Sequence, residues 1–262
     1  MPLSTYTALF FCACRSCFVW PSVLSRIAGS VVRSAVQISF WLALSGGRPF
    51  DGEFVQLLSY VFMITVFHTM IPAKRVAWSE IYDENLIALS SIRPYAFQPA
   101  FHSAMLGTIA GSFITVTLPF MVLFGFLFGI PLPADFSHGL LSFLQAIAGL
   151  LLTNQLLFLF ITLSRMFRGV PHGHAWGFQT MLLVFGGTMI PIWFYPDFLQ
   201  RLCMFLPFRF CAMEAVYGYI SRISIAQGFL GLAVTLFWIS ALYLAGQVLW
   251  RGIEKNAMIH GR

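Results

Sequence analysis

The residues with the richest chemistry in this sequence are histidines and cysteines, and neither set has the spacing of an active site. His172 and His174 follow Arg165 and Arg168 in a short basic stretch. An enzyme embedded in a bilayer would need a nucleophile and a base at one depth. We interpret the stretch as a positively charged turn, and keep a membrane-embedded enzyme as an alternative that alanine substitution of both histidines would test.

The cysteines predict packing more than chemistry. Cys12, Cys14 and Cys17 form a CxCxxC pattern without a fourth ligand at a spacing that suits zinc. We interpret them as small apolar residues, and predict no metal site. Cys203 and Cys211 stand eight residues apart, so a disulfide between them stays an open alternative that geometry decides.

Several catalytic motifs are absent from the sequence. It has no GxxxxGK[ST] loop for nucleotide phosphates, no HExxH pair for zinc and no GxSxG nucleophile turn. Asp83 follows Tyr82, but no second acidic residue lies within an apolar stretch to form an aspartyl dyad. The sequence therefore predicts no enzyme, no catalytic residue and no cofactor of its own.

Uncharged polar residues are scattered through the apolar stretches instead. Hydrogen bonding between helices explains most of them. The alternative is that some line a pathway for an amphiphilic molecule, and the candidates are Thr108, Ser112, Thr115, Asn154, Gln155 and Gln179. His68 and His102 lie near the ends of apolar stretches, where we expect interfacial histidines.

The composition is that of a membrane protein. Of the 262 residues 59% are hydrophobic and only 9% are charged, and the mean hydropathy is +0.83. A soluble domain carries roughly 25% charged residues. The net charge of +6 comes with no nucleic-acid-binding motif, so we predict no nucleic-acid partner.

The elements that carry these residues are predicted by gaps between charges. No Asp, Glu, Lys or Arg occurs in 54–73, 94–134, 136–164, 169–196 or 223–250, and about 20 apolar residues form a helix that spans a bilayer. A sixth span contains Arg26 and Arg33, which we place in its first turns, where long side chains snorkel. We predict spans at about 25–46, 54–73, 101–129, 138–163, 174–194 and 223–250.

The distribution of basic residues predicts the orientation. With six crossings, most Lys and Arg fall on one side, the side that also holds both termini. Basic residues beside spans stay in the cytoplasm. We therefore expect a multi-pass protein of the bacterial cytoplasmic (inner) membrane with cytoplasmic N- and C-termini.

The segment 1–24 is predicted to lie along the membrane surface. Its first fourteen residues contain no Lys or Arg for the basic region of a cleaved signal. Arg15 and Pro21 interrupt its apolar run, so we expect an interfacial helix. A seventh crossing is the alternative.

Two connections are informative. The cytoplasmic segment 74–99 has acidic residues first and Arg93 last before Pro94, the charge order of a short amphipathic helix. On the other side, 193–222 is too charged for a span and too apolar for a free loop, so we expect short re-entrant helices there.

The third span carries marks of bending and of close packing. Pro119 near its middle predicts a kink. Gly107 with Gly111, and Gly125 with Gly129, form GxxxG pairs that let helices approach closely, and a dimer face there is one alternative.

The order of these features resembles the ABC-2 type permeases, the membrane subunits of ATP-driven exporters of the multidrug and daunorubicin-permease kind. The local likeness rests on DENL at 83–86 running to IRP at 92–94, on MIP at 189–191 through FYP at 194–196, and on LPF at 206–208 with YG at 217–218. Asn85 departs from the glycine or other small residue that the family often has.

This resemblance implies an all-α integral membrane protein in one domain over 1–262. Its parts would be six transmembrane helices, the interfacial helix, a cytoplasmic coupling helix between spans 2 and 3, and re-entrant outer helices before span 6. It implies two groups of site residues. The ATPase-coupling group is Glu80, Asp83, Glu84, Leu86, Arg93 and Pro94, and the outer gate is Pro191, Phe194, Pro196, Pro207, Phe208 and Tyr217.

The implied partners are an ATP-binding cassette ATPase subunit, which would hold ATP and Mg, a second permease chain in a homodimer or related heterodimer, and membrane lipid. The implied substrate is amphiphilic or drug-like. A permease for a polysaccharide or lipid-linked glycan is the alternative, since 29 Phe, 7 Trp and 8 Tyr allow an aromatic-lined channel. A purely structural or assembly subunit is a further alternative.

Overall fold

The computed structural model describes residues 3–44, 52–71, 96–129, 132–133, 135–166 and 171–260, and every regular element in these ranges is a helix. Four of the described helical segments are long and apolar enough to cross a membrane. They are α2 (Trp20–Leu44), the continuous run of α6 (Phe97–Ser112), η1 (Phe113–Thr117) and α7 (Leu118–Phe128), then α8 (Phe136–Met166) and α12 (Ile225–His260). The all-α class is thus as predicted.

The remaining helices are shorter. They are α1 (Leu3–Ser16), α3 (Gly52–Met70), α9 (Pro171–Phe185), the 3₁₀ turn η2 (Ile192–Phe194), α10 (Asp197–Phe205) and α11 (Arg209–Tyr219). Of these, α3 has an apolar run from Phe54 to Met70 that is shorter than the four long segments. The count of six crossings therefore stays a prediction.

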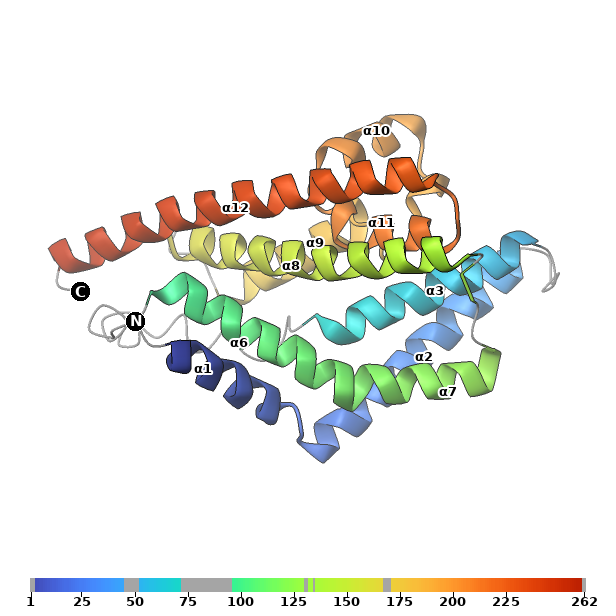
Figure 1. Cartoon of the computed structure of the whole chain (residues 1–262), viewed down its shortest axis with the longest axis horizontal. Coiled ribbons are helices and arrows are strands. Elements are labelled where there is room, and N and C mark those ends of the chain that lie inside the picture. The colour runs from blue at the N-terminus through green and yellow to red at the C-terminus, as the bar shows by residue number, and fades with distance from the viewer. Residues whose placement is uncertain are drawn as a thin grey trace.

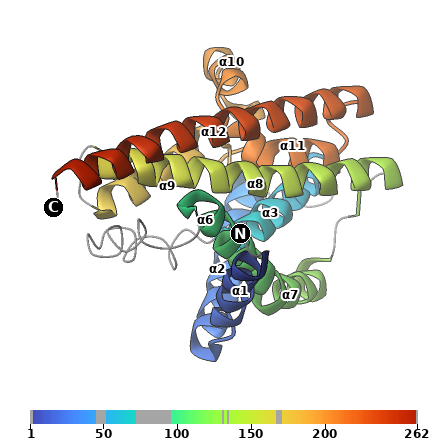
Figure 2. The same cartoon turned by 60° about the vertical axis from the view of Figure 1, so that its left-hand side comes forward.

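Figure 1 shows α8, α12 and the run of α6 and α7 roughly along one direction, and α2 runs obliquely to them. α8 and α12 lie side by side, and α6 with α7 runs beneath them in this view. α1 begins and α12 ends toward the same end of the molecule. Figure 2 shows α10 standing off beyond α12, while α11 lies inward beside α8.

α2 begins five residues before the predicted span. Pro21 does not interrupt the helix but lies in its first turn, where its missing N–H has no intrahelical acceptor to lose. Arg33 consequently lies 13 residues after Trp20 and 11 before Leu44. Its placement in the first turns was wrong: it stands near the middle of the helix.

The predicted distortion near Pro119 is a π-helical turn. η1 separates α6 from α7 just before the proline, and the hydroxyl of Thr117 donates to the carbonyl of Ser112 at 3.3 Å, five residues back. Such a bulge absorbs the missing proline N–H within a continuous helix. α7 then ends at Gly129, whose φ of +78° favours glycine.

The first glycine pair is used inside the chain. A Cβ on Gly107 would collide with the carbonyl of Phe10, and one on Gly111 would lie 2.6 Å from the carbonyl oxygen of Cys14. The pair therefore lets α1 lie directly on α6. Gly129 meets nothing within 4 Å and instead terminates α7.

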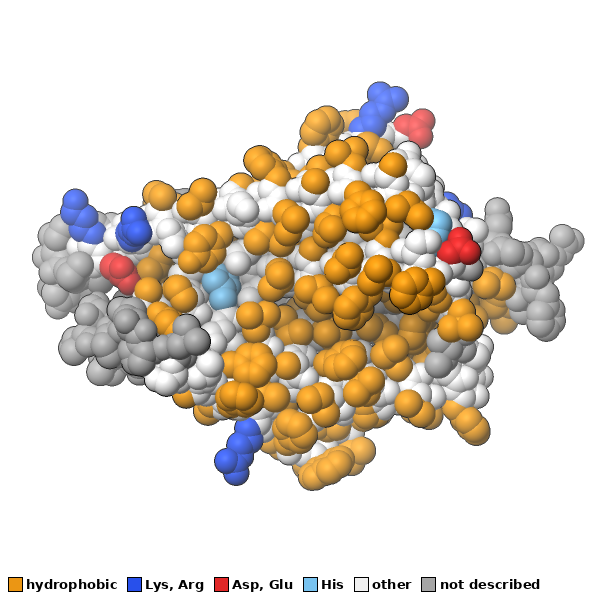
Figure 3. All heavy atoms as spheres, viewed as in Figure 1, with side chains coloured by type: hydrophobic (Ala, Val, Ile, Leu, Met, Phe, Trp, Pro, Cys, Tyr) orange, Lys and Arg blue, Asp and Glu red, His pale blue; other side chains and the backbone are white. Residues whose placement is uncertain are grey.

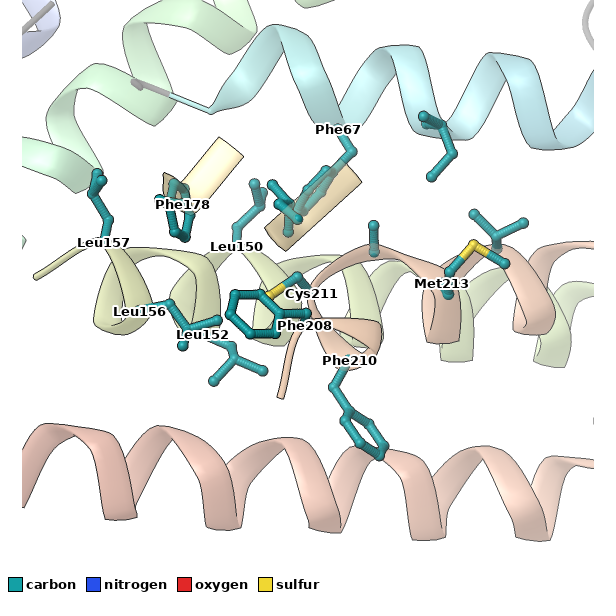
Figure 4. Close-up of a cluster of buried hydrophobic side chains, with 14 of the residues drawn as sticks. Phe67, Leu150, Leu152, Leu156, Leu157, Phe178, Phe208, Phe210, Cys211 and Met213 are labelled. Atoms are coloured by element: carbon teal, nitrogen blue, oxygen red, sulfur yellow. The ribbon is translucent and has the colours of Figure 1, made fainter. Parts of the chain in front are cut away.

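The main core surrounds α11, which packs against α8 and α12. Figure 4 shows Leu150, Leu152 and Cys211 in this cluster, which Phe67 and Phe178 join from α3 and α9. The outer surface is also apolar: in Figure 3 hydrophobic side chains cover the middle of the visible face, and charged ones lie toward its ends and edges. Apolar residues both inside and outside are what a helix bundle in lipid requires.

Candidate functional site

The segment 191–222, which we name the α10–α11 insertion, lies between α9 and the last long helix. Its α11 is buried along almost its whole length, from Phe210 to Val216 and again at Gly218. Contact with α8 is close enough that a Cβ on Gly149 would collide with the carbonyl of Cys211. The hydroxyl of Ser142 also donates to the carbonyl of Ala215 at 2.7 Å.

α11 carries a buried ion pair. The Arg209 guanidinium donates from Nε and Nη2 to Oε1 of Glu214 at 2.9 and 2.8 Å, and the Glu214 residue is 4% exposed. The guanidinium also stands over the ring of Tyr217 at 5.3 Å. Each charge thus has a partner, which offsets the cost of removing both from water.

The C-terminal end of the insertion is connected to α3. Arg222 donates to Oε1 of Gln56 from Nε at 3.0 Å and from Nη2 at 2.8 Å, and stands 4.3 Å from the centre of the Trp193 ring. Ser221, just before it, has a left-handed φ of 55°. Burial raises the pKa of Tyr195, whose hydroxyl donates to the carbonyl of Val184 at 2.8 Å.

The structure brings together two of the predicted outer-gate residues. Phe194 stacks on Trp41 of α2 with ring centres 5.2 Å apart, and Tyr217 lies 5.7 Å from Trp193. Tyr60 of α3 joins Trp193 at 5.8 Å and donates its hydroxyl to the carbonyl of Gly187 at 2.9 Å. This aromatic cluster joins the insertion to α2 and α3.

The other predicted gate residues have different surroundings. Pro191 and Pro207 are buried at the starts of η2 and α11. Phe208 is buried against Phe160 and Phe185, and Pro196 is exposed before α10. The two cysteines of the insertion are both free thiols, so the structure has no disulfide at Cys203 and Cys211.

The candidate pathway residues have different surroundings. Thr108 and Thr115 donate their hydroxyls to carbonyls of their own helix, and Ser112 accepts from Arg26 at 3.0 Å. Asn154 and Gln155 are buried in α8 with side-chain oxygens that have no hydrogen-bond partner. Gln179 is partly buried in α9.

A second group of polar residues, which the pathway prediction did not include, surrounds Asn154. Gln98 of α6 donates to the carbonyl of Tyr243 at 3.1 Å, and its Oε1 is left without a partner. His102 lies beside Asn154. Its two ring nitrogens are buried, and neither makes a hydrogen bond of good distance and angle. The α6, α8 and α12 helices therefore share a neutral polar cluster inside the chain.

A polar contact surface also joins α2 to α3, and we name it the α2–α3 seam. Ser34 and Thr65 lie 3.1 Å apart between their hydroxyl oxygens. Arg26 donates to the carbonyl of Thr69 at 2.6 Å, which supplies a partner for the C-terminal end of α3. The hydroxyl of Thr69 in turn lies 2.7 Å from that of Thr117 in η1.

Arg33 belongs to this seam and has no such partner. It is partly buried and within electrostatic reach of Tyr60 and His68 on α3, yet it makes no hydrogen bond or ion pair with any residue that the structure describes. Sequence reasoning missed it because it placed the helix start at residue 25. Counting from Trp20 would have put Arg33 at mid-helix.

Some predicted residues cannot be placed. The coupling group, Glu80, Asp83, Glu84, Leu86, Arg93 and Pro94, lies outside the described residues, as do Arg168 and the side chains of Arg165, His172 and His174. Among the residues described, no group of three His, Cys, Asp or Glu is placed to hold a metal ion.

The long apolar helices and the apolar surface define the class as a helical membrane protein, with four described helical segments able to cross a bilayer. No protein-family model, curated protein or solved structure matches the chain.

Proposed function

We propose that this chain is the membrane-spanning permease subunit of an ATP-driven exporter of the ABC-2 type, which provides the path for an amphiphilic substrate. ATP hydrolysis belongs to a separate subunit, and two permease chains form the path between them. The termini and the segment 74–99 are cytoplasmic, in the inner membrane of a bacterium.

The observation that carries the proposal is the position of the α10–α11 insertion. Two short helices stand between α9 and the last long helix, and the second of them is buried against α8 and α12. Irregular backbone at this depth is tolerated only where protein surrounds it. This is the arrangement expected of re-entrant helices that control release from a path.

The aromatic contacts of the insertion support a role in gating. Phe194 of η2 stacks on Trp41 of α2, and Trp193 contacts Tyr60 of α3. A movement of α2 against α3 would therefore be passed directly to the insertion. Aromatic stacking contributes about 0.5–1.5 kcal/mol per pair, weak enough to break and re-form during transport.

The coupling role is proposed from the sequence of 74–99. Glu80, Asp83 and Glu84 would enter a cleft of the ATPase, and closure of that cleft would move the helices on either side. α1 begins and α12 ends toward the same end of the molecule, which supports the proposal that both termini lie on one side of the membrane.

The test is capture of an ATPase by the tagged chain from its own cells in mild detergent. Reversal of Glu80, Asp83 and Glu84 to Lys should reduce the captured ATPase activity at least about tenfold. The three new lysines would face the groups of the ATPase that bind the acidic residues, and like charges that face each other at an interface cost several kcal/mol. Asp197→Lys, an exposed reversal in the insertion, is the matched control and should leave capture unchanged. Unchanged capture and export in the triple variant would refute the coupling role.

A further inference from the structure

Arg33 is an unusual arginine in this molecule. Among the arginines whose side chains the structure describes, Arg33 alone is partly buried and makes no hydrogen bond or ion pair. Arg26 binds the end of α3, Arg209 binds Glu214 and Arg222 binds Gln56. The remaining described ones are exposed: Arg15, Arg201 and Arg251.

The position makes the missing partner costly. Arg33 is about 20 Å along α2 from Trp20 and about 17 Å from Leu44, at 1.5 Å per residue. If α2 crosses the bilayer, the charge stands near its middle, where charged side chains are rare and mark binding or transport sites. No acidic side chain that the structure describes supplies a counter-charge to Arg33.

The neighbouring polar atoms also lack partners. Gln37 and Trp41 follow Arg33 at intervals of four residues, on one face of α2. Oε1 of Gln37, Nε1 of Trp41 and Nε2 of His68 are all buried without a hydrogen bond, and Trp41 is only 5% exposed. Buried polar groups in native proteins almost always have a hydrogen-bond partner, so these unpaired atoms mark an unusual stretch of α2 and α3.

The chemistry of this group favours an anion. The guanidinium presents five donors in a planar fork that fits a carboxylate or a phosphate. The described acidic side chains are engaged elsewhere: Glu214 with Arg209, Glu254 with Trp250 and Asp135 with His138. The exposed Asp197 lies at the start of α10.

An apolar stripe runs beside the polar one. Val32, Val36 and Phe40 each precede a member of the polar face by one residue, and they are 62%, 63% and 51% exposed. The two stripes together present an anion-binding end and an apolar track on the same helix. An amphiphile with one negative headgroup and one acyl chain matches both.

We propose that Arg33 binds the anionic headgroup of an acyl amphiphile, with the chain of the ligand along Val32, Val36 and Phe40. The ligand is a free amphiphile, which would be the exported substrate, because the headgroups of bilayer lipids lie about 15 Å from the middle of the membrane. The role of the ligand as an exported substrate rests on the proposed exporter function. Binding of the ligand does not, because binding needs no ATPase.

The experiment measures binding of 11-bromoundecanoate by its quenching of tryptophan fluorescence. The full chain is placed in phosphatidylcholine nanodiscs, and 11-bromo-1-undecanol, equal in length but uncharged, is titrated beside it. Protein-free nanodiscs correct both probes for partition into lipid. The variants are Arg33→Gln, Arg33→Lys and, as a control that removes an exposed charge, Arg15→Gln.

Wild-type protein should bind the carboxylate saturably and more tightly than the alcohol. Arg33→Gln should weaken carboxylate binding by roughly 10- to 100-fold, because hydrogen bonds to charged groups are the stronger kind. Arg33→Lys should keep part of the affinity and Arg15→Gln all of it. Equal wild-type binding of acid and alcohol, or an unchanged Arg33→Gln, would overturn the site, and the first comparison holds even if the variant fails to fold.

Phosphatidylglycerol in the nanodiscs tests whether an anionic lipid of the bilayer takes the site instead. The surface charge of the lipid changes the wild-type and Arg33→Gln dissociation constants by the same factor, so the ratio of the two constants does not depend on it. A ratio that falls toward one as phosphatidylglycerol is added would overturn the assignment to a free amphiphile, and a constant ratio supports that assignment. Loss of ATPase capture by the wild type would refute the exporter while leaving the site intact, so the two proposals fail separately.

Discussion

Two arginines in the interior of this protein have opposite surroundings. Arg209 of α11 is paired with Glu214 at 2.8 Å, in the packed core between α8 and α12. Arg33 stands in the α2–α3 seam with no described partner, beside exposed apolar side chains. The contrast separates a charge that maintains the fold from one that is available to a ligand, and it predicts different results when each is removed.

The largest expected effect is at the ion pair. Glu214→Ala leaves the guanidinium of Arg209 buried without its partner, which should cost about 3–5 kcal/mol of unfolding free energy. Unfolding in mixed SDS and detergent micelles, followed by circular dichroism, measures this. The double variant Glu214→Leu with Arg209→Met should recover most of the loss. Stability unchanged in the single variant would contradict a structural role for the pair.

The next effect concerns the contact between α8 and α11. Gly149→Ala places a methyl group against the carbonyl of Cys211, so the helices must separate, and we expect a loss of about 1–3 kcal/mol. Gly29→Ala in α2 is the matched control, because nothing lies within 4 Å of its Cβ, and it should stabilise by up to about 1 kcal/mol. The same unfolding assay compares them, and equal effects would contradict the close packing of α11.

A smaller effect is expected where the insertion meets α3. Tyr60→Phe removes the hydroxyl that donates to the carbonyl of Gly187 and leaves the ring on Trp193. We expect a loss of about 0.5–1.5 kcal/mol, the net contribution of one hydrogen bond. Tyr243→Phe, in α12, is a control without a described bond from its hydroxyl. A Tyr60→Phe protein as stable as the wild type would show that the hydrogen bond from Tyr60 to Gly187 does not stabilise the fold.

The smallest effect should be a gain. Ser221 has a φ of 55° after α11, and its hydroxyl is buried without a partner. Glycine adopts this conformation without a steric penalty, so Ser221→Gly should stabilise by about 0.5–1 kcal/mol. A destabilised variant would show that the Ser221 hydroxyl has a partner of its own.

The sequence was a good guide where charge alone decides structure. The charge-free runs 136–164 and 223–250 correspond to α8 and most of α12, because a long apolar helix needs no tertiary information. A distortion near Pro119 was also predicted, although its π-helical form in η1 was not. The short helices of the insertion were expected from Pro196 and Pro207, which stand at the starts of α10 and α11.

The site residues were harder to predict, because tertiary neighbours decide which polar groups lack partners. Thr108 and Thr115 donate their hydroxyls to carbonyls of their own helix, and their place on a pathway stays a prediction. Gly107 looked like a contact for a second chain, but α1 covers it. Arg33 was assigned to an end of its span, since Pro21 was taken as an interruption when it is part of the first turn.

The central claim is that the chain works with a separate ATPase. It is tested by purifying the wild-type chain from its own cells in mild detergent, identifying the proteins that come with it and measuring ATP hydrolysis. We predict an ATP-binding cassette subunit in equal numbers with permease chains, and hydrolysis that vanadate inhibits. A chain that is purified alone from membranes that contain such ATPases, and that has no associated hydrolysis, would contradict the account.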